Sequence, residues 1–133
     1  MRLQALLYNL TTVLVATDDA NVAERAAALC PELTFRWYAG FNRSMLEECG
    51  GKTSDCWLEG RLARGELDPN HMTSGWLIDV QLLSYGHAFV GQWGSNLSRL
   101  AYLLALSRRR SKLPFISLDG PWRFSHLPMG LFA

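Results

Sequence analysis

Residues 88–96 read AFVGQWGSN, and this stretch decides the fold. Its first three residues form a short apolar run, which is typical of a buried strand. A turn with two glycines follows, and Ser95 is a good N-cap for a helix that we expect to continue to about Ser107. The next apolar run, Leu113–Leu118, predicts another strand. A strand, a helix and a strand in this order indicate a parallel pair joined by a right-handed crossover.

The amino-terminal part of the chain repeats this pattern. Val13–Ala16 predicts a buried strand, Ala20–Leu29 predicts an alanine-rich helix, and Leu33–Trp37 predicts a short second strand. The first sixteen residues also have the outline of a signal peptide, with a positive start and an apolar stretch. Because polar residues interrupt that stretch, we favour the strand and find no convincing targeting signal.

The middle of the chain is less regular. Ala39–Cys49 is ambiguous, and residues 50–72 contain several glycines and an Asp-Pro-Asn turn, which predicts an irregular loop. A further helix is expected over Gly75–Ser84, with Thr73 and Ser74 as its N-cap residues. Together these elements predict an α/β fold with a parallel sheet, in a single domain over residues 1–133.

Composition excludes several classes of protein. The chain has 133 residues, 49% of them hydrophobic, and a formal net charge of +1, which gives no global field to attract nucleic acid. No apolar run approaches the ~20 residues needed to span a bilayer, so we expect no membrane contact by this segment. The cysteines offer no zinc spacing, and we expect no metal. Cys49 and Cys56 either close a short disulfide loop or stay as free thiols.

The turn at residues 91–96 is the strongest candidate for a binding site. Ligands of open α/β sheets collect at the carboxyl ends of strands, where a helix N-terminus presents unpaired N–H groups to an anion. Gly91 and Gly94 permit a close approach of the backbone, and Ser95 and Asn96 add side-chain donors. The alternative is that the two glycines only shape the turn.

Asp79 is the second candidate, because it lies between apolar residues on the expected helix. A buried carboxylate needs donors. The donors either belong to a ligand, such as the edge of a guanine base, or Asp79 points to solvent or pairs with Arg99. Arg99 lies one turn deeper than Ser95 on the same helix face. It either reinforces a phosphate site or neutralises an internal carboxylate, and we favour the structural role.

Asp18 and Asp19 follow the first predicted strand, at the end where a ligand would bind. An adjacent acidic pair suggests a metal site like that of an Asp-x-Asp motif. Because the two residues have no spacer between them, we expect at least one of them to cap the following helix instead.

Four segments, in this order and spacing, resemble the carboxyl-terminal part of the catalytic domain of α-1,6-fucosyltransferases. They are VATDD at 15–19, IDVQLLS at 78–84, FVGQWGSNLSRLAY at 89–102 and FISLDG at 115–120. The resemblance covers about residues 12–120, with a poor match over residues 39–71. That family includes the enzyme that core-fucosylates N-glycans and its rhizobial chitin-oligosaccharide relatives.

The resemblance implies an incomplete GT-B-type architecture, of which this chain is the Rossmann-like lobe that holds GDP-fucose. It implies that Asp79 accepts hydrogen bonds from guanine. It also implies that Ser95 and Asn96, which stand where the family has a Ser-Gln pair, bind the diphosphate.

The same resemblance implies that Asp18 and Asp19 border the nucleotide pocket and that Arg99 matches an arginine on the same helix. The family needs no metal, so we expect no cofactor; GDP-fucose is the donor substrate. At Gly94 the chain departs from the commoner serine, which removes a hydroxyl from the turn.

The family's His-x-Arg-Arg segment and its acidic base candidate precede the matched region, so we expect the catalytic residues upstream and this chain alone to be inactive. The expected partners are GDP-fucose and a glycan acceptor, with either a missing amino-terminal lobe or self-association. Localisation would be the Golgi lumen or secretory pathway in a eukaryote and the cytoplasm in a bacterium. The alternatives are a non-catalytic Rossmann-like module that has lost nucleotide binding, or a transferase for another nucleotide sugar.

Overall fold

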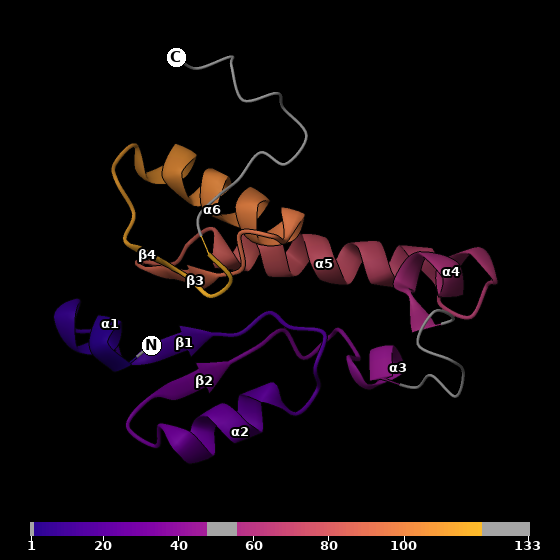
Figure 1. Ribbon diagram of the computed structural model, residues 1–133, viewed down its shortest axis with the longest axis horizontal. Coiled ribbons are helices and arrows are strands. Elements are labelled where there is room, and N and C mark those ends of the chain that lie inside the picture. Colours follow the sequence, from indigo (N-terminus) through magenta and orange to yellow (C-terminus); the bar gives the residue numbers. More distant parts are fainter. Residues whose placement is uncertain (1, 48–55, 121–133) are drawn as a thin grey trace.

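The computed structural model describes residues 2–47 and 56–120, which form a mixed α/β fold with small parallel sheets (Figure 1). The elements in chain order are α1 (Arg2–Leu7), β1 (Thr12–Leu14), α2 (Val22–Leu29), β2 (Thr34–Arg36), α3 (Ser44–Glu47), α4 (Leu58–Ala63), α5 (Pro69–Leu83), β3 (Phe89–Gly91), α6 (Asn96–Arg109) and β4 (Phe115–Ser117). The predicted α/β class is therefore confirmed.

The strands form two separate parallel pairs. β1 pairs with β2, and β3 pairs with β4; in the described part of the chain, no pairing joins β1 to β3. The chain enters all four strands from the same end, so that their arrows point the same way (Figure 1). The sequence predicted one parallel sheet, whereas the described residues form two separate two-stranded parallel sheets.

The second pair has its own aromatic core. Phe89, Trp93 and Tyr102 pack on one another, with the Trp93 and Tyr102 ring centroids 5.0 Å apart in an edge-to-face arrangement. The Tyr102 hydroxyl donates to the Leu113 carbonyl oxygen at 3.1 Å, which ties α6 to the chain just before β4. Aromatic pairs of this geometry add to the stabilisation that burial alone provides.

The first pair is less regular than predicted. The strand predicted at Val13–Ala16 is present as Thr12–Leu14. Arg2–Leu7 forms a helix, α1, that was not predicted. The backbone ladder runs on past β1, because the Val15 N–H donates to the Arg36 carbonyl at 2.8 Å. α2 packs on β2.

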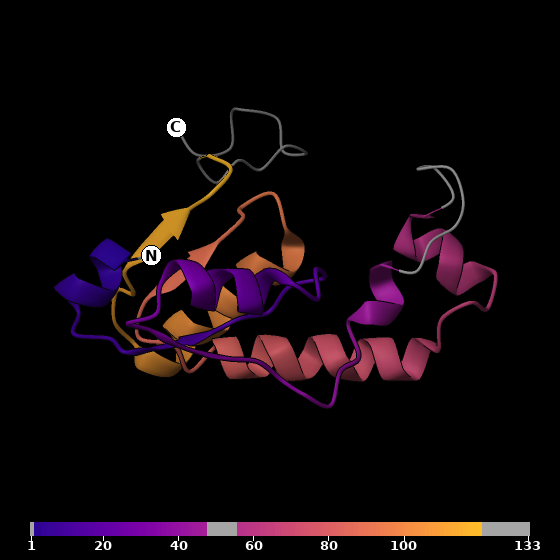
Figure 2. The ribbon, with the colours of Figure 1, turned by 90° about the horizontal axis from the view of Figure 1, so that it is seen from below.

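α5 begins six residues before the predicted start at Gly75. Asp68 is its N-cap, whose carboxylate accepts from the Asn70 N–H at 2.9 Å, and Pro69 occupies the first turn. An Asp-Pro pair that the sequence analysis assigned to a turn is thus a helix start, since proline is well tolerated at the first helical position. α5 runs along the long axis of the molecule, with α3 and α4 beside its amino-terminal end (Figure 2).

The predicted irregular loop over residues 50–72 is wrong where the structure describes it. Leu58–Ala63 forms α4, and Pro69 already belongs to α5. Buried Arg61 holds this region together by donating to the Met45 and Leu46 carbonyl oxygens at 2.9 and 3.0 Å. Residues 50–55 of the predicted loop, and Cys49, lie outside the described residues; Cys56 is disulfide-bonded and Cys30 is a free thiol.

Gly75 lets the loop after β2 lie directly against α5. A Cβ atom built on Gly75 would stand 2.5 Å from the ring of Phe41, which is 4% exposed. No side chain fits in that space. The glycine therefore allows the close contact between α5 and the segment that leads to Arg43.

Candidate functional site

A groove of about 860 Å³ separates β1 from β3. Asp18 lines it from the segment after β1, Asp79 from α5, and Ser95 from the N-cap of α6. Three residues that the sequence analysis selected from separate segments therefore border one groove. Asp19, Gly94, Asn96 and Arg99, all of them described, do not line it.

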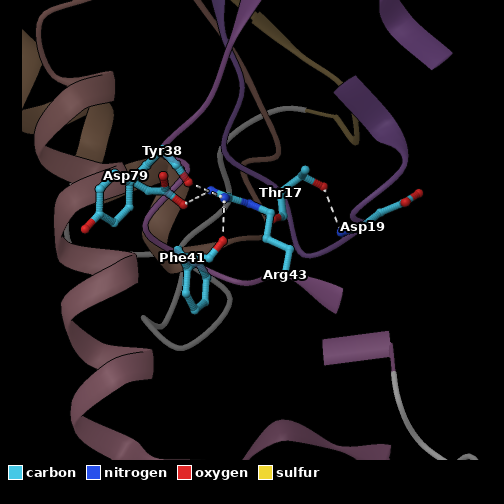
Figure 3. A network of polar contacts seen from close by, with 6 residues as sticks. All are labelled: Thr17, Asp19, Tyr38, Phe41, Arg43 and Asp79. Atoms are coloured by element: carbon cyan, nitrogen blue, oxygen red, sulfur yellow. Dashed lines mark hydrogen bonds and ion pairs between the residues drawn. The ribbon is translucent and has the colours of Figure 1, made fainter. Parts of the chain in front are cut away.

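Buried Arg43 is the centre of the polar contacts beside this groove (Figure 3). Its Nε donates to the Thr17 carbonyl at 2.8 Å, and its Nη1 donates to the Tyr38 and Phe41 carbonyls at 3.0 and 3.4 Å. Its Nη2 pairs with Asp79 Oδ2 at 2.5 Å. One guanidinium group thus joins the ends of both strands of the first pair to α5.

Asp79 is paired, but with a residue that the sequence analysis did not consider. Its side chain is 10% exposed and that of Arg43 is 7% exposed, so both charges are largely removed from water. Burial raises the pKa of the Asp79 carboxyl, and the Arg43 guanidinium opposes part of that rise. Arg43 precedes Asp79 by 36 positions, so no local spacing could have indicated the pair.

The turn before α6 does hold an anion, and that anion is a side chain of the same protein. The Trp93 and Gly94 N–H groups each donate to the Asp119 carboxylate at 2.7 Å. These hydrogen bonds, that from Gly94 first, lower the pKa of Asp119. A Cβ on Gly94 would stand 2.7 Å from Asp119 Oδ2, so a larger residue there would displace the carboxylate. The sequence analysis expected a phosphate group at this turn and did not consider Asp119.

Ser95, Asn96 and Arg99 have different surroundings. The Ser95 hydroxyl caps α6 by accepting from the Ser98 N–H at 3.4 Å. Asn96 is exposed in the first turn of the helix. Arg99 Nε donates to the Trp93 carbonyl at 2.5 Å, which ties α6 to the turn that precedes it.

Asp19 and Asp18 have different contacts. The Asp19 carboxylate accepts from the Asn21 N–H at 2.8 Å and forms an ion pair with Arg25, so it turns the chain into α2. Exposed Asp18 lines the groove and also a second pocket of about 540 Å³, which it shares with Asp19, Trp57 and Glu59. The expected capping role is taken by neither of them: Asn21 is the N-cap of α2, which has no side-chain cap bond, and Asp19 bonds in the turn just before the helix.

Among residues 2–47 and 56–120, no group of three or more His, Cys, Asp and Glu side chains is arranged to hold a metal ion. Within the same residues, no helix is both long enough and apolar enough to cross a bilayer.

No known family model matches the chain, and a search of curated proteins finds no match either.

Proposed function

We propose that this chain is the donor-binding part of a GDP-fucose-dependent fucosyltransferase, the Rossmann-like lobe of a GT-B-type enzyme. The observation that carries the proposal is the groove that Asp18, Asp79 and Ser95 share at the N-terminus of α6. Its volume of about 860 Å³ lies within the range of small-molecule sites, roughly 300–1,000 Å³.

The N-terminus of α6 supplies the chemistry for the diphosphate. The N–H groups of Asn96 and Leu97 donate to no acceptor among the described residues, as expected for the first turn of a helix. Leu97 lines the groove. These donors and the positive end of the helix dipole favour a phosphate group at this position.

The proposal concerns donor binding, and transfer needs more. Inverting transfer to a carbohydrate hydroxyl requires stabilisation of the leaving GDP and a positioned acceptor. The groove can provide part of the stabilisation of the leaving GDP. Asp79 is already paired with Arg43, so it is not available as a general base in this state. We therefore do not expect transfer by the isolated chain.

Calorimetric titration with GDP, GMP and ADP tests the proposal. GDP should bind best, because GMP lacks the second phosphate and ADP lacks the guanine edge. Asn96→Asp adds a negative charge at the helix N-terminus, which favours the helix but repels a diphosphate. It should weaken GDP binding about tenfold, since Asn96 lies between Ser95 and Leu97, which line the groove, and a nearby like charge costs on the order of 1–2 kcal/mol. Gln81→Glu is the matched control, because it adds the same charge at an exposed α5 position that does not line the groove.

The absence of heat with GDP, or an Asn96→Asp variant that binds like the parent, would count against a diphosphate at α6. Tighter binding of another nucleotide would indicate a different nucleotide-sugar transferase.

A second candidate function has its own support. Arg43 neutralises Asp79, and Asp119 satisfies the Gly94 turn, so both predicted ligand contacts already have internal partners. A non-catalytic module that keeps the fold without binding nucleotide fits these contacts. A stable monomer in size-exclusion chromatography that ignores GDP would favour this second candidate.

A further inference from the structure

The groove between the two strand pairs is bordered by strand edges on both sides. Seven consecutive residues, 12–18, line it along β1, and five consecutive residues, 88–92, line it along β3. β1 has its only strand partner, β2, on the opposite side, and β3 likewise has β4 within the described chain. Both inner edges therefore open into the same space.

The hydrogen bonds show which backbone groups face the groove. The Val15 N–H donates to the Arg36 carbonyl, and the Thr11 carbonyl accepts from the Thr34 N–H. Both partners lie in β2, so the odd-numbered residues along β1 direct their backbone groups to β2. The Phe89 N–H and the Gly91 carbonyl bond to the segment of β4. Because consecutive residues of a strand direct their backbone groups to opposite sides, Leu14 and Val90 direct theirs into the groove.

The dimensions of the groove match one more strand. A strand in a layered sheet occupies roughly 160 Å³ per residue, from strand spacing of ~4.8 Å, a rise of ~3.3 Å and layer spacing of ~10 Å. A volume of about 860 Å³ then holds roughly five residues. Side chains from α2, α5 and α6, among them Val22, Val80 and Leu97, also line the groove. A strand buried by helices in this way is apolar along its length.

We propose that the groove binds an extended apolar segment of about five residues, parallel to β1 and β3, from another polypeptide. The completed sheet would have the order β2, β1, inserted strand, β3, β4. This is the order of a doubly wound sheet in which the central strand is added from outside. The main-chain donors and acceptors of both inner edges would supply the binding, as in other cases of strand addition.

The four described strands of a second copy of this chain cannot fill the groove in the same way. Its outer strands, β2 and β4, each have one edge already paired within their own sheet. Such a strand could bond to β1 or to β3 but not to both. The occupant must have two free edges, which only a segment outside any sheet provides.

Residue-resolved hydrogen exchange by NMR tests this proposal without any nucleotide. The probe is a peptide of five consecutive valine and isoleucine residues with two lysines at each end for solubility. At ten times its Kd, it should slow exchange of the Leu14 and Val90 amides about tenfold. The Val15 and Phe89 amides, which already bond within their own pairs, are the internal controls and should change far less.

Two comparisons make the result specific. A peptide with proline at the central position lacks a needed N–H and should protect neither amide. Val90→Pro removes the groove-facing donor while leaving the Phe89 and Gly91 bonds to the other strand, and it should abolish binding. Val90→Ala keeps the groove-facing N–H, so this variant should still bind the peptide.

The proposal is overturned if Leu14 and Val90 show no protection, or if the proline peptide protects them equally. It is also overturned if the chain without peptide forms a dimer in which the Leu14 and Val90 amides are already protected. The strand would lie between β1 and β3, whereas GDP is proposed beside Asp18 and Ser95, which follow these strands. Each ligand is measured in the absence of the other, so the two proposals can fail separately.

Discussion

The two strand–helix–strand units of this protein are stabilised in different ways. The β3–α6–β4 unit buries a contiguous cluster that includes Phe89, Trp93 and Tyr102. The β1–α2–β2 unit buries only scattered residues, among them Ala23 and Phe35, and forms no core cluster of its own in the described chain. The same connectivity can therefore be supported by a local core in one unit and by contacts from elsewhere in the other.

The helices of the two units also differ, because α6 is longer and better capped than α2. α6 has 14 residues, a side-chain cap from Ser95 and two basic residues in its last turn. α2 has 8 residues, no side-chain cap bond and no basic residue in its last turn. Caps and charges that complement the helix dipole each contribute a fraction of a kcal/mol or more. The second unit thus carries the stronger local determinants of folding.

The largest effect should follow from removing the centre of the second unit. Trp93 is 2% exposed, so Trp93→Ala should lower the free energy of unfolding by about 3–5 kcal/mol. Urea denaturation followed by circular dichroism measures this. Trp57→Ala is the control, because Trp57 is 68% exposed and its loss should cost less than about 0.5 kcal/mol. Equal losses would show that the aromatic cluster does not support the unit.

The next effect concerns the contact that supports the first unit. Arg43→Met leaves the Asp79 carboxylate buried without its cation and should cost about 3 kcal/mol. The control, Arg36→Met, removes an exposed arginine from β2 and should cost little. Replacing both members, as Arg43→Met with Asp79→Leu, should recover much of the loss. A single variant as stable as the parent would mean that the ion pair does not hold the unit together.

The smallest effect should depend on pH and concerns the turn before α6. The folded state lowers the pKa of Asp119, so its contribution is present above the ordinary value of 3.8 and is lost as pH falls toward the folded-state pKa. The urea midpoint of Asp119→Asn should therefore lie below that of the parent at pH 7, and the difference should shrink at pH 3. Asp79, whose pKa is raised, acts in the opposite direction, but it is common to both proteins and cancels. A difference that grows on acidification would contradict this account of the turn.

Local patterns in the sequence predicted the second unit well, because its strand, turn and cap lie within residues 88–96. The contacts of Arg43 with Asp79 and of Gly94 with Asp119 span 36 and 25 positions, and no periodicity reports such pairs. Asp68 and Pro69 show a different limit. The same dipeptide suits a turn and a helix start, and only the helix that follows decides between them.

Adding a single methyl group at Gly75 would affect the ion pair between Arg43 and Asp79. An alanine there would push on the Phe41 ring, and Phe41 lies two residues before the arginine that reaches Asp79. Pushing the loop away from α5 would lengthen the gap between the two charges and admit water to a carboxylate that is now 10% exposed. A substitution that changes no charge at all would thereby act as an electrostatic mutation.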